Sequence, residues 1–233
     1  MKVGFMRAMR TLHKWLALVV GIQLVLWTVS GLVFAFLDEE KVSAAGSLRS
    51  LPPAVLPRGA RLLQPGLLPG IGSGELVDVT LQPLHDQWVY RLRFVDRVEL
   101  RHAADGAPFV VNEARVRELA TERYGGSGAL EAVALRAAPV LEARGAGAVW
   151  DAAFDDPGRT RLYFSAEDGG FVAARNDSWR LFDVFWMLHT MDYRGRDDFN
   201  HPLVILFTTG ALWIGISGAL LLVQSFRPAR PGR

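Results

Sequence analysis

Histidine is the residue type here that can ligate a soft metal, because the 233 residues include five histidines and no cysteine. The lack of cysteine excludes a disulfide framework, a zinc–thiolate site, a Cys-ligated iron–sulfur cluster, a cysteine nucleophile and covalent CxxCH haem attachment. His13, His189 and His201 lie in or beside strongly apolar segments. His85 and His102 lie near predicted turns, and we interpret both as surface residues. The first three are therefore the candidates for metal chemistry.

Motifs for other chemistries are missing from the sequence. It has no G-x-S-x-G, no H-E-x-x-H, no Walker loop, and no G-x-G-x-x-G after a strand. Lys and Arg number 26 against 24 Asp and Glu, so the pI near 9.2 does not indicate nucleic-acid binding. The chain therefore offers no recognisable flavin, nicotinamide or nucleotide site.

Two uncharged apolar stretches, Trp15–Leu37 and Pro202–Val223, decide the class of protein. At about 1.5 Å per residue, each is long enough to cross a hydrocarbon core of roughly 30 Å. A cleaved signal peptide is the alternative for the first stretch. We favour an uncleaved anchor, because the apolar run exceeds the usual signal core of about 7–15 residues and no small-x-small cleavage site follows it.

The charges that flank these stretches predict their orientation. Asp38, Glu39 and Glu40 follow the first stretch directly. Basic residues lie at the opposite ends of both stretches: Lys2, Arg7, Arg10, Lys14, Arg227, Arg230 and Arg233. The positive-inside rule then predicts cytoplasmic termini, with residues 38 to about 178 on the far side of the membrane.

The segment between the stretches divides by composition. Residues 44–74 are rich in Pro, Gly and Leu without a regular period, which indicates an extended connector. From Glu75 onwards short alternating runs predict strands, and Asp105-Gly106 predicts a hairpin turn. Asn112 predicts an N-cap for an amphipathic helix over Glu113–Tyr124.

A weak repeat lies within this segment. VELRHAADGAPFVV (98–111) resembles RLYFSAEDGGFVAA (161–174), since each has a strand, an acidic-Gly turn and an apolar return. The pattern fits either two ordinary hairpins or a duplicated small α+β unit.

Both ends of the chain resemble a known family. The opening RTLHKWLALVVGIQLVLWTVSGLVFAF and the closing WRLFDVFWMLHTMDYRGRDDFNHPLVILFTTGALWIGISGALLL, with the strand and acidic-Gly turn between them, resemble the PepSY-associated transmembrane-helix family. Residues 44–180 match only in pattern. Several members are similar to inner-membrane reductases of ferric siderophores that carry b-type haem on membrane histidines. The resemblance implies a bacterial inner-membrane protein with a periplasmic PepSY-like domain, haem b, and ferric iron or ferric siderophore as electron acceptor.

Haem b needs two axial imidazoles, an apolar slot and polar groups at its propionates. A helix–turn–helix arrangement would bring His189 and His201 together at the outer leaflet as axial ligands. Arg194 and Arg196, in the turn between them, would meet the propionates. The apolar walls would come from Phe182, Phe185, Trp186 and Phe199.

His13 cannot join this outer site within one chain, because a straight helix places it about 36 Å from Leu37. It is either a ligand of a separate inner haem or no ligand. A homodimer would bring two copies of His13 together at the inner face. Small residues that permit the close approach of helices are Ala211, Gly215, Gly218 and Ala219.

Three functions remain open from the sequence. The first is a haem b oxidoreductase that takes electrons from a membrane quinol or a cytoplasmic donor and reduces ferric iron or ferric siderophore outside. The second is a non-catalytic membrane module whose PepSY-like domain binds a protein partner or inhibits a peptidase; its histidines would be interface anchors. The third is an accessory subunit of a larger complex.

The predicted fold class is an α+β membrane protein. It has two transmembrane helices, an interfacial helix and one extracytoplasmic PepSY-like α+β domain with antiparallel strands, and we expect a homodimer in contact with lipid. The predicted segments are a cytoplasmic N-terminus (1–14), transmembrane helix 1 (15–37), a connector (38–74), the periplasmic domain (75–177), an interfacial helix and turn (178–200), transmembrane helix 2 (201–224) and a cytoplasmic tail (225–233).

Overall fold

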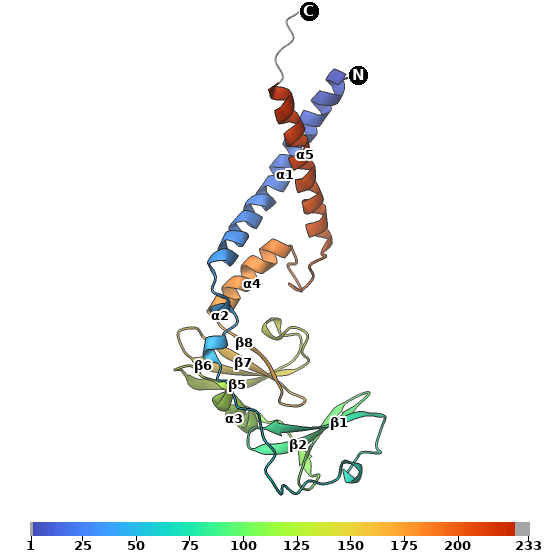
Figure 1. Cartoon of the computed structure of the whole chain (residues 1–233), viewed down its shortest axis with the longest axis vertical. Coiled ribbons are helices and arrows are strands. Elements are labelled where there is room, and N and C mark those ends of the chain that lie inside the picture. The colour runs from blue at the N-terminus through green and yellow to red at the C-terminus, as the bar shows by residue number, and fades with distance from the viewer. Residues whose placement is uncertain (1, 227–233) are drawn as a thin grey trace, which may run out of the picture. The chain divides into compact units, whose positions relative to one another are not determined.

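The computed structural model describes residues 2–226 (Figure 1). Contacts divide the chain into two compact units: unit 1 contains the residues up to Leu37 and from Leu181 onwards, and unit 2 is Asp38–Arg180. Unit 2 contains both the predicted connector (38–74) and the predicted domain (75–177). The predicted basic tail residues Arg227, Arg230 and Arg233 lie outside the described residues.

Unit 1 is built on two long helices, α1 (Lys2–Phe36) and α5 (Pro202–Ser225). They run antiparallel, because Val20 lies against Gly210 and His13 against Ser217. Figure 1 shows α1 and α5 crossing and then diverging, with the end of α4 (Asp177–Thr190) between the diverging segments. Within unit 1, α4 therefore lies beside the C-terminal half of α1.

Both long helices have the length and composition needed to cross a membrane. Only 17% of the most apolar window in α1 is buried, and 6% of that in α5. The core helix of a soluble protein would be mostly buried, so these values favour an apolar surrounding for both helices. Leu18, Ile22 and Leu206, for example, are each more than half exposed.

One stripe of α1 faces the other helices of unit 1. Its members recur at alternating intervals of four and three residues, and all are buried or half-buried: Met9, His13, Leu16, Val20, Gln23, Trp27, Ser30 and Phe34. This is the spacing of a helix–helix seam, since two turns of helix return the same face about every seven residues. We call this stripe the α1 seam.

The close approach of α1 and α5 uses glycines within one chain. A methyl group added to Gly210 would lie 3.0 Å from Val20, and one added to Gly218 would lie 3.3 Å from His13. Gly215 and Ala219, which the sequence assigned to a dimer contact, are exposed. They therefore lie off the α1–α5 contact, and the expected homodimer stays a prediction.

Unit 2 contains two four-stranded antiparallel sheets, each in simple meander order. The first consists of β1 (Leu76–Leu84), β2 (Gln87–Phe94), β3 (Val98–His102) and β4 (Pro108–Phe109). The second consists of β5 (Ala129–Arg136), β6 (Val149–Asp155), β7 (Arg161–Ser165) and β8 (Phe171–Arg175). The antiparallel strands expected from the sequence are confirmed, and each sheet is followed by a helix: α3 (Glu113–Arg123) after the first and α4 after the second.

The two sheets repeat the same local structure. Asp105 and Asp168 each accept the backbone N–H two residues further on, at 2.9 and 3.0 Å. Gly106 and Gly169 follow them with φ of +73° and +69°, a conformation that glycine adopts at little cost. This agreement in detail supports the duplicated α+β unit rather than two unrelated hairpins.

An asparagine caps the helix that follows each sheet. The side chain of Asn112 accepts the N–H of Arg115 at 3.0 Å, as the sequence predicts for α3. Asn176 accepts the N–H of Trp179 at 2.8 Å at the start of α4. Each half of unit 2 is therefore a four-stranded meander joined through an Asn cap to a helix.

Residues 44–74 differ from the free connector that their composition predicted. They contain short helical turns, α2 (Glu39–Val42) precedes them, and Ala44 and Leu68 are almost fully buried. Leu68 packs with Leu62 and Leu63 over the face of the first sheet that bears Tyr90. This stretch is therefore a cover for an otherwise exposed apolar sheet face.

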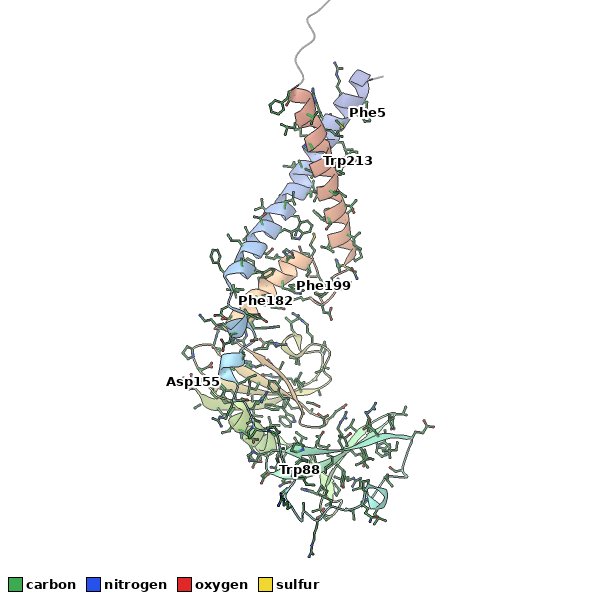
Figure 2. All side chains as sticks on the ribbon, viewed as in Figure 1. Phe5, Trp88, Asp155, Phe182, Phe199 and Trp213 are labelled. Carbon is green, nitrogen blue, oxygen red and sulfur yellow. The ribbon has the colours of Figure 1, made fainter. Side chains whose placement is uncertain are left out.

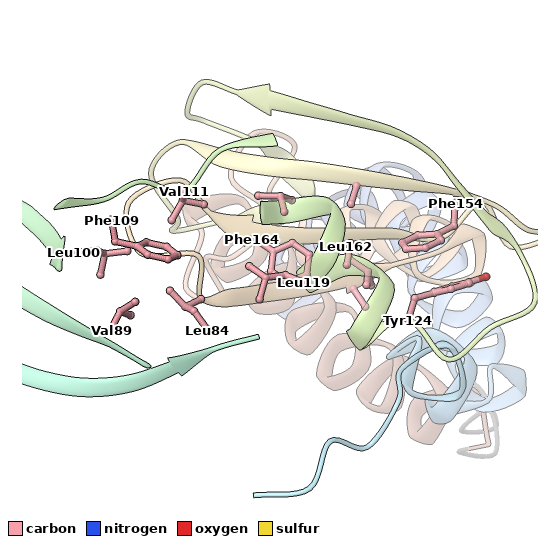
Figure 3. Close-up of a cluster of buried hydrophobic side chains, with 14 of the residues drawn as sticks. Leu84, Val89, Leu100, Phe109, Val111, Leu119, Tyr124, Phe154, Leu162 and Phe164 are labelled. Carbon is pink, nitrogen blue, oxygen red and sulfur yellow. The ribbon is translucent and has the colours of Figure 1, made fainter. Parts of the chain in front are cut away.

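One hydrophobic cluster joins the two halves of unit 2 (Figure 3). The first half contributes Leu84, Val89, Leu100, Phe109 and Val111, α3 contributes Val116, Leu119 and Ala120, and the second half contributes Ala152, Phe154, Leu162, Phe164 and Ala174. Because α3 contributes to the same cluster as both sheets, the duplicated halves share one core.

The Asp-Gly turn of the second half provides a test of this shared core. Gly169→Ala should destabilise the protein, because a Cβ there would lie 3.0 Å from Leu84 in a left-handed backbone. We expect a loss of about 2–4 kcal/mol from backbone strain and overpacking together. Gly145→Ala is the matched control, since its φ is +75° with open space around the added methyl, and it should lose only about 1–2 kcal/mol. Denaturant titration of the full chain in micelles, followed by proteolysis of unit 2, compares the two; equal losses would contradict the shared core.

Candidate functional site

His189 lies against the α1 seam. Its Nδ1 is 2.8 Å from Ser30 Oγ, and its ring centroid is 5.6 Å from that of Phe34 and 6.3 Å from that of Trp27. Burial lowers the pKa of His189, which favours the neutral imidazole that a metal ligand requires. The sequence predicted this histidine as a site residue, and the structure gives it a polar partner in an aromatic surrounding.

The α1 seam also holds the C-terminal end of α4. Gln23 donates to the carbonyl of Leu188 at 3.1 Å, and the indole N–H of Trp27 donates to the carbonyl of His189 at 2.7 Å. The last carbonyls of a helix have no partner within that helix, and an apolar surrounding supplies no water for them. These two side chains therefore provide a cap that fixes the position of His189.

His13 has the same kind of partner at the other end of the α1 seam. Its Nδ1 is 2.7 Å from Oγ of Ser217 on α5. Ser217 is almost fully buried, and its hydroxyl donates to the carbonyl of Trp213 at 2.7 Å, one turn earlier in the helix. When the hydroxyl proton is used in that donation, Ser217 accepts from the imidazole, and Nδ1 of His13 carries the proton.

Ser30 repeats this arrangement for His189. Its hydroxyl is 3.1 Å from the carbonyl of Trp27, within α1, so it accepts the Nδ1 proton of His189 when it donates there. Nε2 of His13 and of His189 then holds a free lone pair, and neither atom has a hydrogen-bond partner in the part of the chain that the structure describes. This is how a metal-ligating histidine is prepared: one ring nitrogen is fixed by a hydrogen bond and the other is available.

The two imidazoles lie at well-separated levels of unit 1. Ser30 and His13 are 17 positions apart on α1, which corresponds to roughly 25 Å along the helix axis. His13 and His189 therefore lie at two separate levels along α1; the assignment of these levels to an inner and an outer site stays a prediction.

His201 is engaged differently from the other two. Its Nδ1 accepts the backbone N–H of Leu203 at 3.4 Å, in the first turn of α5. This contact places the proton of a neutral imidazole on Nε2. His201 lies next to the start of α5, as predicted, but ligation through Nε2 requires its proton to leave that atom. Its role as an axial ligand stays a prediction.

The two arginines predicted for the propionates differ in their surroundings. Arg196 forms an ion pair with Asp183, which is almost fully buried. The backbone carbonyl of Arg196 accepts the indole N–H of Trp186 at 2.9 Å. Arg194 is exposed. Arg194 is therefore the more available of the two cations for a ligand.

Aromatic rings gather beside His189, as predicted for the walls of a slot. Trp186 stacks on Phe182 with centroids 5.8 Å apart and meets Phe199 edge-on at 5.1 Å. Figure 2 labels Phe182 and Phe199 at the end of unit 1 where α1 and α5 diverge. Phe185 is half-buried on the same helix. The aromatic residues are thus brought together, although Trp186 is packed mainly against its own neighbours.

Asp192 organises the turn between α4 and α5. It is 5% exposed, and its two carboxylate oxygens accept the backbone N–H groups of Arg194, Gly195, Asp197 and Asp198 at 3.0–3.2 Å. Desolvation raises the pKa of Asp192, but the four donors outweigh it and lower the pKa to about 2. The charged segment Arg194–Asp198 is therefore a structured turn around the carboxylate of Asp192.

The other two histidines lie in unit 2, where His85 is exposed and His102 is half-buried. His85 pairs with Glu122 at 2.8 Å, and His102 meets Phe109 edge-on at 5.0 Å. We interpreted both as simple surface residues, yet each has a specific contact. No group of three or more His, Asp or Glu side chains that could hold a metal occurs among residues 2–226.

From the sequence, Gln23 and Ser30 could form hydrogen bonds between helices, but neither they nor Ser217 were assigned a chemical role. The available signal was their spacing, because polar residues at seam positions of an apolar helix must find partners on another helix. Gln23 and Ser30 do occupy such positions, seven residues apart.

Comparison with known proteins gave no relatives: no family model, no curated protein and no solved structure matches this chain. The resemblance to the PepSY-associated family therefore stays an expectation.

Replacing the two serines tests whether they hold the imidazoles. Ser30→Ala and Ser217→Ala should each reduce stability by about 0.6–2 kcal/mol, the usual range for a hydrogen bond between membrane helices. Thr28→Ala and Thr209→Ala are matched controls, since both side chains are exposed and bond only to carbonyls of their own helix. Unfolding in mixed micelles gives the free energies; losses as large in the threonine variants would show that the serine–histidine bonds contribute nothing.

The low pKa of Asp192 predicts a specific dependence on acid. Ionised Asp192 stabilises the folded turn fully above its ordinary pKa of 3.8, and this contribution is lost as the pH falls through about 2. Asp192→Asn should therefore lower the melting temperature at pH 5 and converge with the wild type near pH 2. Asp197→Asn, an exposed neighbour, should follow the wild type throughout; a constant difference for Asp192→Asn down to pH 2 would refute the assignment.

Proposed function

We propose that this chain is a membrane haem b oxidoreductase that passes electrons to ferric iron or a ferric siderophore on the periplasmic side of a bacterial inner membrane. The observation that supports it best is the paired arrangement of His13 with Ser217 and His189 with Ser30. Each imidazole is held through Nδ1 by a serine hydroxyl and has Nε2 unused among the described residues. Two such levels are what a transmembrane electron path requires.

The membrane setting of this proposal rests on α1 and α5. Their exposed residues are apolar along most of their length, and lipid would satisfy these faces without a further protein layer. The proposed orientation, with cytoplasmic termini and a periplasmic unit 2, rests on the basic flank that includes Arg7, Arg10 and Lys14.

The residues present fit haem b in type. His189 with His201 would hold an outer haem, between walls that include Phe185 and Trp186, and Arg194 would meet a propionate. His13 would hold an inner haem with His13 of a second copy, because the other four histidines lie elsewhere in the sequence. When bound, haem iron would supply one-electron transfer by alternating between its ferric and ferrous states.

The chain's own contribution would be orientation and exclusion of water. Ser30 and Ser217 would keep Nε2 of each histidine unprotonated, and the hydrogen bond at Nδ1 would make the ligand more basic. Gln23 and Trp27 would hold the end of α4 in register with α1, so that His189 keeps its level. Electrons would come from a membrane quinol or a cytoplasmic donor.

Optical spectra of the purified protein test this proposal. Wild-type protein, from cells supplied with haem precursors, should show the sharp α and β bands of six-coordinate low-spin haem b after dithionite reduction. His189→Ala and His201→Ala should each abolish the outer haem and slow ferric reduction, and His13→Ala should lower the haem-to-protein ratio while the outer haem remains. Arg194→Ala should weaken haem retention or shift its potential.

His102→Ala is the control, since this side chain lies in unit 2 against Phe109. It should leave the haem content unchanged. A featureless spectrum from haem-replete cells would refute the oxidoreductase proposal. The histidines would then serve to join helices, and the alternative of a non-catalytic module that binds a partner through unit 2 would stand.

A further inference from the structure

Unit 2 contains a groove where its two halves meet. The hollow has a volume of about 540 Å³ and lies between the connector, the β1–β2 turn, the end of α3 and the β7–β8 turn. This volume lies within the range of roughly 300–1,000 Å³ that is typical of small-molecule sites. Most of its lining is apolar, including Leu51, Pro53, Leu84, Leu119, Phe164 and Phe171.

Arg123, the last residue of α3, is a cation in this groove that lacks a counter-ion. One guanidinium nitrogen donates to the carbonyl of Arg49 at 3.1 Å, and the group lies over the ring of Phe171 at 5.0 Å. Its Nε is buried without a hydrogen-bond partner, and no carboxylate among the described residues lies within ion-pair distance. Because Nε is closed to solvent, a ligand in the groove would instead accept from the terminal nitrogens of this half-buried guanidinium.

The acidic groups near Arg123 are already occupied. Glu122 also lines the groove, but its carboxylate is 2.8 Å from Nδ1 of His85. The other arginines of α3 have partners as well: Arg117 pairs with Glu113, and Arg115 pairs with Glu118. Arg123 therefore differs from its neighbours in having its positive charge available.

The rim of the groove is held in a strained conformation. His85, in the two-residue turn between β1 and β2, has a φ of +54°, which is unfavourable for a residue with a side chain. Its ion pair with Glu122 joins this turn to α3. Strained residues of this kind persist where the surrounding structure fixes them, often at ligand sites.

We propose that this groove binds a small molecule that has a carboxylate on an aromatic body. The carboxylate would accept from Arg123, as a charge-assisted hydrogen bond. The aromatic body would lie on the apolar walls, where Phe164 and Phe171 already meet edge-on at 5.8 Å. This site is independent of the haem proposal, because every residue in it belongs to unit 2.

Equilibrium dialysis of 1-naphthoate against the full chain in lipid nanodiscs tests the proposal, with empty nanodiscs as the blank. We expect saturable binding at one site per chain. The neutral isostere 1-naphthalenemethanol should bind at least about tenfold more weakly, because it cannot form the charged contact. Equal affinity for the two compounds, or no saturable binding of naphthoate, would overturn the proposal.

Variants locate the binding to the groove. Arg123→Gln should lower the affinity for naphthoate at least about tenfold and leave the affinity for the alcohol unchanged. The unchanged affinity for the alcohol would also show that the variant is folded. Phe171→Ala should lower the affinity for both compounds. Because Phe171 is 40% exposed, this variant tests the site even if Arg123→Gln does not fold. Arg117→Gln removes the same charge from the same helix outside the groove and should change neither affinity. Naphthoate binding that survives both Arg123→Gln and Phe171→Ala would refute the site.

Discussion

A polar side chain on a helix surrounded by hydrocarbon must find its partner on another helix, because no water is present to replace it. The α1 seam places four such side chains along one stripe: His13, Gln23, Trp27 and Ser30. Each of them meets α4 or α5 through a hydrogen bond of 2.7–3.1 Å. The register of α5 and the position of the end of α4 both follow from these bonds, with glycines such as Gly210 allowing the close approach.

The same hydrogen bonds connect the packing of unit 1 to its proposed chemistry. A serine that bonds back to its own helix has only lone pairs left to offer, so it accepts a proton from a histidine instead of donating one. When Ser30 and Ser217 donate to their own helices, they favour the tautomer of His189 and His13 that carries its proton on Nδ1. A helix pair that was stabilised only by apolar packing would leave the imidazoles without a fixed orientation. The hydrogen bonds that hold the helices together are thus the same ones that would orient the imidazoles toward a ligand.

Local features of this chain were predictable from its sequence, and features that depend on distant contacts were not. The cap at Asn112, the turn at Asp105-Gly106 and the alternating strands are set by neighbouring residues, so composition and spacing indicated them correctly. The burial of Leu68 over the first sheet depends on a chain segment that returns from elsewhere. The division of the α1 seam between α4 and α5 depends likewise on pairs more than 150 residues apart. In the same way, the backbone contact of His201 could not be distinguished by sequence from the serine contacts of the other two histidines.

The two duplicated halves have the same local structure, but the helices that follow their sheets border different candidate sites. Both halves of unit 2 have a four-stranded meander, an Asp-Gly turn and an Asn-capped helix, but the two helices differ in composition. In α3, charged residues alternate with a few core residues such as Val116 and Leu119, so this helix stays in unit 2 and its last residue, Arg123, borders the groove. In α4, aromatic and aliphatic residues replace most of the charges, so the helix continues into unit 1 and brings His189 to the α1 seam in its last turn. The divergence between two copies of one helix therefore separates the groove of unit 2 from the candidate histidine site among the long apolar helices.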